Sequence, residues 1–160
     1  MSGKEIEQYR IKRQRVRSSL QSKGTRGSRK TLKRLSGRER TTTRVVNHTI
    51  AKRIVEKAKA EGKVVHGYGA STKGSTTLQF CNVTPDLVSA IADRNPVKWG
   101  SYTIGTQIKI ISEEESRAAK PDYYLVLPWH FMPEFLKRET EFLARGGKFV
   151  VPMPQVHLVG

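Results

Sequence analysis

The glycine-rich octapeptide Gly67–Gly74 combines residue types and a position that suit phosphate binding. It follows an apolar segment at 64–68 and precedes a segment at 76–81, which we predict as a strand and a helix. In α/β folds such a turn binds phosphate, because glycines let the backbone approach the anion and free N–H groups at the helix start point toward it. The candidate ligands are Gly67, Tyr68, Gly69, Ala70, Ser71, Thr72, Lys73 and Gly74.

This octapeptide matches neither of the two best-known phosphate loops. A dinucleotide fingerprint requires glycine where Thr72 stands, and a Walker A loop requires lysine where Ser75 stands. A nucleoside triphosphatase is therefore disfavoured. Two interpretations stay open: a phosphate or nucleotide contact, and a tight strand-to-helix turn without a ligand.

Two further candidate positions follow predicted strands. Asp93 ends the apolar segment 87–92, about 20 residues after the loop, where an acid accepts hydrogen bonds from a ribose. The same Asp93, with Arg94 and the Asn-Pro pair that follows, is also typical of an Asx turn. Trp129 follows the segment 123–127, and it could stack on a base or anchor the next helix to the sheet.

Predicted strands and helices alternate through the C-terminal half. The strands are expected at 64–68, 87–92, 106–111, 123–127 and 148–151, and the helices at 76–81, after the N-cap residue Ser112, and at 131–145. This order predicts the α/β class, with a Rossmann-like, mostly parallel sheet flanked by helices. A basic helical segment is expected before it, with helices at 1–20, 32–37 and 39–61 and a break at 22–28. On the last of these helices, Val46, Ile50, Ile54, Val55 and Ala58 are expected to face the sheet, and Gly62 to end it.

The charge of the chain is concentrated in that N-terminal segment. The 160 residues carry a net charge of +16, and residues 1–65 hold 20 Lys and Arg against 5 Asp and Glu. Such a segment either binds nucleic-acid phosphates or is a solvated arm. The candidate nucleic-acid contacts are Arg13, Arg15, Arg17, Lys23, Arg29, Lys30, Lys33 and Arg34.

Several classes of protein and site are excluded by composition. The single cysteine, Cys81, excludes a disulfide scaffold, and the four scattered histidines lack metal-ligand spacing. No apolar run reaches the length of a membrane span, and no secretory signal is present. We therefore expect a cytoplasmic protein without a metal site or an identifiable catalytic residue.

The C-terminal half resembles a known family through several ordered motifs. These are the loop Gly67–Gly74, Asp93-Arg94-Asn95-Pro96, Gly105-Thr106, Lys120-Pro121-Asp122-Tyr123, Leu127-Pro128-Trp129, Gly146-Gly147-Lys148-Phe149 and Pro152. Residues 62–160 thereby resemble the C-terminal domain of S-adenosylmethionine (SAM)-dependent sugar C-methyltransferases. The resemblance implies a domain that binds a nucleotide-sugar, with the loop at the diphosphate and Asp93, Arg94 and Trp129 near the nucleotide. The family's zinc-binding cysteines and SAM-binding motif have no counterpart, so this chain alone is expected to bind no cofactor and to transfer no methyl group. A separate SAM-binding methyltransferase chain would have to supply SAM.

Residues 8–63 resemble a different family, the transposon-encoded RNA-guided nucleases. The resemblance rests on Arg13–Leu20, Gln21–Thr25, Lys33–Glu39 and Val46–Val55. The catalytic acid expected after Val65 is missing, because the sequence there reads His-Gly-Tyr-Gly, so nuclease activity is not expected. The two resemblances predict a fusion of a basic segment, 1–61, to a Rossmann-like domain, 62–160. The predicted function is nucleotide-sugar binding, and the alternative is a nucleic-acid-binding remnant of a nuclease.

Overall fold

The structure, a computed structural model, describes residues 29–160, with side chains from Val45 onward. Contacts divide the chain into two compact units, Met1–Val45 and Val46–Gly160. Helix α2 (Arg29–Ala60) crosses this division, and every strand belongs to the second unit. The helix expected at 1–20 and the break at 22–28 lie outside the described residues. None of the described helices has the length and apolarity needed to cross a bilayer.

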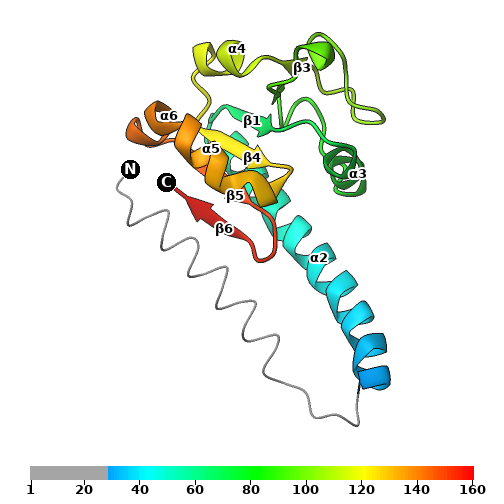
Figure 1. Cartoon of the computed structure of the whole chain (residues 1–160). Helices are drawn as coiled ribbons and strands as arrows, with labels where there is room; N and C mark the ends of the chain where they lie inside the picture. The colour runs from blue at the N-terminus through cyan, green and yellow to red at the C-terminus, as the bar shows by residue number, and fades with distance from the viewer. Residues whose placement is uncertain (1–28) are drawn as a thin grey trace. The chain divides into compact units, whose positions relative to one another are not determined.

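The second unit is built on a six-stranded sheet with the order β3-β2-β1-β4-β5-β6 (Figure 1). The strands are β1 (Val65–Tyr68), β2 (Ile91–Ala92), β3 (Ile110–Ile111), β4 (Tyr123–Val126), β5 (Lys148–Val151) and β6 (His157–Val159). All neighbours pair in parallel except β5 and β6, which are antiparallel. The strand order and the dominance of parallel pairs confirm the predicted Rossmann-like α/β fold.

Side chains of β1 alternate between two differently packed faces of this sheet. Val65 belongs to an aliphatic core that also contains Val55 of α2 and Leu78 of α3 (Thr72–Phe80). Tyr68 points to the opposite face, where its ring packs edge-on against Tyr124 and Phe135. Helices α4 (Glu113–Ala118), α5 (Met132–Arg138) and α6 (Thr140–Ala144) follow β3 and β4 in the chain, and Figure 1 shows α5 in front of the sheet. Helices on both faces explain why the strands β1 to β5 are largely buried.

The packed face of α2 agrees with the expected one at its C-terminal end. Val55 and Ala58 are buried in the aliphatic core together with Ala51, and Ile54 packs against it, whereas Val46 and Ile50 are exposed. Polar Asn47 is buried instead, where its side-chain amide donates to the carbonyl of Pro154 at 2.8 Å. Spacings of three and four residues describe both stripes equally well, so periodicity alone was wrong for Val46 and Ile50. The expected end at Gly62 is confirmed, because this residue has a φ of +72° and begins the turn that caps α2.

Several element boundaries also differ from the prediction. The two helices expected at 32–37 and 39–61 form the single helix α2, because glycine in a helix interior carries only a modest penalty. Helix α3 begins at Thr72 rather than 76, and the strands expected at 87–92 and 106–111 shrink to two residues each. The helix expected at 131–145 is divided into the short 3-10 helix η2 (Trp129–Phe131), α5 and α6. Strand β6 was not predicted. Ser112 does cap α4, accepting from the N–H of Glu115 at 2.9 Å.

A buried polar network lies on the aromatic face of the sheet. The Tyr68 hydroxyl donates to Glu139 at 2.6 Å, and Arg117 forms an ion pair with the same carboxylate at 2.7 Å. His66 lies beside the Ser116 hydroxyl at 2.8 Å, which in turn is 3.0 Å from the Tyr124 hydroxyl. Satisfied networks of this kind fix one packing arrangement, because every misplaced partner would leave a buried polar atom unpaired.

Burial of His66 predicts acid sensitivity. Desolvation lowers the pKa of this imidazole from 6.5 to about 4. The unfolded chain therefore takes up the proton first, so the stabilisation is complete above pH 6.5 and declines as the pH falls toward 4. Unfolding in urea should show the free energy of unfolding falling by up to about 1.4 kcal/mol per pH unit in this window. His66→Gln should flatten this slope, and an unchanged slope would contradict the assignment to His66.

Candidate functional site

The loop Gly67–Gly74 has the strand–turn–helix geometry predicted for it. It joins the carboxyl end of β1 to the first turn of α3, and β1 is the strand at which the sheet order reverses. Open α/β sheets bind ligands at this switch point. Gly69 has a φ of +81°, and a side chain there would lie 2.5 Å from the Pro128 ring. A side chain at Gly74 would lie 2.8 Å from Leu127, so both glycines have a packing reason as well.

The start of α3 leaves backbone donors open. Ser71 is the N-cap, and its hydroxyl accepts from the N–H of Gly74 at 3.1 Å. In the part of the chain that the structure describes, no backbone hydrogen bond uses the N–H of Ser71, Thr72 or Lys73. Thr72 and Lys73 are also exposed. Consecutive N–H groups at a helix start favour an anion, because the peptide dipoles of the helix add to their positive charge.

The predicted ligands within the loop do not all have accessible side chains. Gly67 lies inside β1, where a Cβ would meet Ile91 at 2.8 Å. Tyr68 is 1% exposed and its hydroxyl is engaged by Glu139, so this side chain belongs to the core. Ala70 is buried too, and its backbone N–H donates to the Asp93 carboxylate. The accessible part of the loop is therefore its second half, from Ser71 to Lys73.

Asp93 connects the loop to the end of β2. Its Oδ2 accepts from the N–H of Ala70 at 2.7 Å and from Lys98 Nζ at 3.1 Å. Its Oδ1 accepts from the N–H of Asn95 at 2.8 Å, which is the Asx turn that the sequence indicated. Since Asp93 is 7% exposed, its main structural role is to hold two backbone segments and an ammonium group together. Oδ2 already accepts two hydrogen bonds and Oδ1 accepts one, so Oδ1 can accept a further one and the ribose contact stays a prediction.

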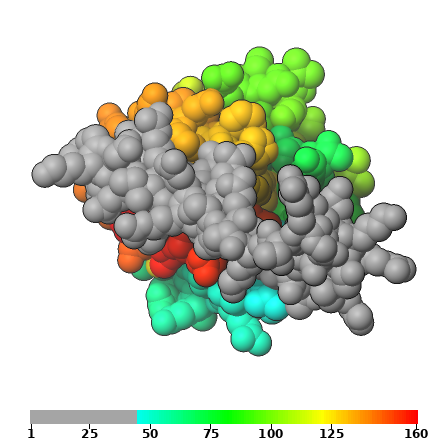
Figure 2. All heavy atoms as spheres, turned by 60° about the horizontal axis from the view of Figure 1, so that its bottom comes forward, coloured from blue at the N-terminus to red at the C-terminus, as the bar shows by residue number. Residues whose placement is uncertain are grey.

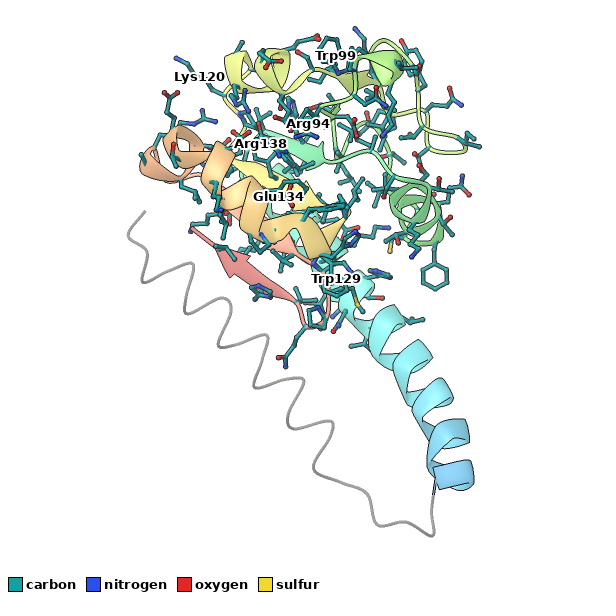
Figure 3. The ribbon with its side chains drawn as sticks, viewed as in Figure 1. Arg94, Trp99, Lys120, Trp129, Glu134 and Arg138 are labelled. Carbon is teal, nitrogen blue, oxygen red and sulfur yellow. The ribbon has the colours of Figure 1, made fainter. Side chains whose placement is uncertain are left out.

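The other two predicted residues lie on opposite sides of the loop. Arg94 is exposed and follows Asp93 on the β2 side. Trp129 is half-buried and follows Pro128, on the β4 side. Figure 3 shows Arg94 in the upper part of the view, well separated from Trp129. The structure thus brings the loop and Asp93 together, and it separates Arg94 from Trp129.

Sequence reasoning missed two residues of this site, Lys98 and Trp99. Besides its contact with Asp93, Lys98 Nζ donates to the carbonyl of Ala70 at 2.7 Å. The Trp99 indole N–H donates to the carbonyl of Asp93 at 2.7 Å. Both residues lie at the end of the short 3-10 helix η1 (Pro96–Lys98). The sequence did contain one signal for this site: Trp99 follows a polar turn, where a large apolar side chain is unexpected.

The remaining predicted contacts belong to the N-terminal unit. Arg13, Arg15, Arg17 and Lys23 lie outside the described residues, and Arg29, Lys30, Lys33 and Arg34 lie on α2 where side chains are not described. Within residues 29–160 no group of three His, Cys, Asp or Glu side chains is arranged to hold a metal ion.

Comparison with known families now decides the assignment. A family model described as the C-methyltransferase C-terminal domain matches residues 5–154. The chain belongs to this family. C-methyltransferase NovU of Streptomyces niveus is 40% identical over 106 residues, which are 66% of this chain and 25% of NovU. This chain thus spans about a quarter of NovU.

The family match bears on the resemblance of residues 8–63 to transposon-encoded nucleases. It begins at residue 5 and so includes nearly all of the basic segment. The comparisons give no support to a nuclease origin or to a nucleic-acid-binding role for this segment. A distinct origin for it is therefore not needed to explain the sequence.

Removing the Asp93 carboxylate tests its role as the connection between β1 and β2. Asp93→Ala leaves the N–H groups of Ala70 and Asn95 without their acceptor and the Lys98 ammonium without its counter-charge. The free energy of unfolding in urea should fall by about 2–4 kcal/mol. Lys98→Met should cost about 1 kcal/mol or less, because Asp93 keeps both backbone donors. A loss below about 0.5 kcal/mol in Asp93→Ala would show that the carboxylate does not hold the loop.

Proposed function

We propose that this C-methyltransferase C-terminal domain binds a nucleotide-sugar, with the diphosphate on the first turn of α3. The observation that carries the proposal is the set of open N–H groups at Ser71, Thr72 and Lys73. They follow β1 at the switch point of the sheet, where α/β folds bind phosphorylated ligands. The side chains of Lys73 and Lys98 add positive charge on either side of this turn.

NovU is a C-methyltransferase, and this activity supports the choice of a substrate that accepts a methyl group on carbon. A C-terminal domain covering a quarter of such a protein is suited to holding the substrate rather than to carrying out the whole reaction. We therefore propose that SAM is bound by a separate methyltransferase domain or chain and that this domain presents the sugar to it. Arg94 and the residues after β2 would contact the nucleoside half of the ligand.

Substitution of Thr72 by proline tests the anion site without disturbing the fold. Proline is favoured at the first position of a helix, and Ser71 already has the extended conformation, φ −141° and ψ 152°, that a residue before proline requires. Thr72→Pro therefore removes one N–H and fills the space in front of it. Isothermal titration with thymidine diphosphate (dTDP) should show affinity about 10- to 100-fold weaker, with an unchanged melting temperature.

Thr72→Ala is the matched control, because it removes the hydroxyl and keeps the N–H. It should retain wild-type affinity within about threefold, since a single neutral hydroxyl contributes little. Equal binding by wild type and Thr72→Pro would place the phosphate elsewhere. The absence of binding of dTDP, dTDP-sugars and pyrophosphate to the wild-type chain would refute the proposed function.

The proposal that a separate domain or chain binds SAM leads to a second prediction. SAM added to this chain alone should produce neither heat in titration nor a shift in melting temperature, while dTDP should produce both. A micromolar SAM complex of the isolated chain would contradict the proposal that a separate domain binds the cofactor.

A further inference from the structure

The segment between β2 and β3 presents large side chains to solvent beside the candidate phosphate loop. Trp99 is 42% exposed in the described part of the chain, although tryptophan is usually well buried. In the space-filling view of Figure 2 the residues near position 100, drawn in bright green, project from the body of the domain. An indole exposed to this extent leaves a large part of its apolar surface in water, which makes that surface available to a ligand.

Trp99 is held rigidly in spite of its exposure. Its backbone N–H donates to the carbonyl of Pro96 at 3.1 Å, and its indole N–H donates to the carbonyl of Asp93 at 2.7 Å. The backbone of Asp93 is itself fixed by donation from its N–H to Ile111 of β3 at 3.0 Å. The ring is therefore anchored at both ends of its side chain, and a preorganised ring loses little entropy when a ligand stacks on it.

The anchor of Trp99 is also the anchor of the loop. Asp93 accepts the indole N–H on its carbonyl and the N–H of Ala70 on its carboxylate. The indole is thus linked through Asp93, by two hydrogen bonds, to Ala70, which precedes the open N–H groups of α3. The Lys98 side chain contacts both Ala70 and Asp93. Trp99 and Arg94 both lie in the upper part of Figure 3.

We propose that Trp99 is the stacking platform for the nucleobase of a nucleoside diphosphate whose phosphates lie on the first turn of α3. This rests on the proposed function. In doubly wound sheets the ribose lies at the carboxyl end of the second strand, so the base continues outward on that side. The segment after β2 is where Trp99 lies. An indole face stacks on any base, and the cations Arg94 and Lys98 nearby suit an anionic ligand.

Variants of Trp99 distinguish the contribution of its aromatic ring from that of its indole hydrogen bond. Trp99→Leu removes the aromatic face and the indole N–H. Trp99→Phe keeps an aromatic face and removes the N–H. Trp129→Phe removes the other tryptophan of the chain, so that Trp99 alone reports indole fluorescence. Each is titrated with dTDP and with inorganic pyrophosphate, which has the phosphates and no base.

If the proposal is right, Trp99→Leu binds dTDP about 5- to 100-fold more weakly and binds pyrophosphate as wild type does. Trp99→Phe should retain most of the dTDP affinity. In Trp129→Phe, dTDP should quench the fluorescence of the remaining indole, and in Trp99→Phe the quenching should disappear.

The outcomes that overturn the proposal are distinct from those that overturn the function. Wild-type dTDP affinity in Trp99→Leu excludes stacking while leaving the phosphate site intact. Equal weakening of dTDP and pyrophosphate, or equal loss in Trp99→Phe and Trp99→Leu, shows that Trp99 acts by holding the loop. Binding of pyrophosphate with no gain from the nucleoside of dTDP also refutes the platform. Failure of both ligands with the wild-type chain refutes the proposed function itself.

Discussion

The candidate site depends on one buried carboxylate. Asp93 accepts hydrogen bonds from Ala70 and Asn95 and pairs with Lys98, so one side chain holds the turn after β1 to the turn after β2. The cost of burying a charge is offset only when such partners surround it. Two of the three are backbone N–H groups, which cannot move without moving the strands. The positions of the open donors at α3 and of Trp99 both follow from this contact.

The glycines of the loop show why composition alone could not decide its role. Gly69 needs its positive φ and lies against Pro128, while Gly74 lies against Leu127. Packing therefore accounts for both without a ligand. The open donors at the start of α3 are a separate observation, because they are N–H groups that an anion could accept from. Every α-helix begins with such donors, and water can satisfy them where they are exposed, so the phosphate contact stays a proposal.

The sequence predicted the sheet and the strand–turn–helix order of the loop, because apolar runs bounded by turn residues report local burial. It predicted element boundaries less well where contacts between residues distant in the sequence determine them. The helix expected at 131–145 is divided at Glu139, whose carboxylate is buried against Tyr68 and Arg117 from other elements. Lys98 was missed for the same reason, since its contact with Ala70 joins two segments that are 28 residues apart in the sequence. Strand β6 has only three half-exposed residues, too few for an alternating pattern to be visible.

The net charge of the chain has little bearing on anion binding at this site. Of the surplus, +15 comes from residues 1–65, whereas residues 66–160 hold 10 basic and 9 acidic side chains. A diphosphate at α3 would therefore be attracted by local groups: the first-turn N–H groups, Lys73 and Lys98. At physiological ionic strength exposed charges are screened beyond about 8 Å, so the attraction depends on charges and donors close to the diphosphate. Specificity for a nucleotide over a simple anion would then have to come from neutral contacts such as stacking, which salt does not weaken.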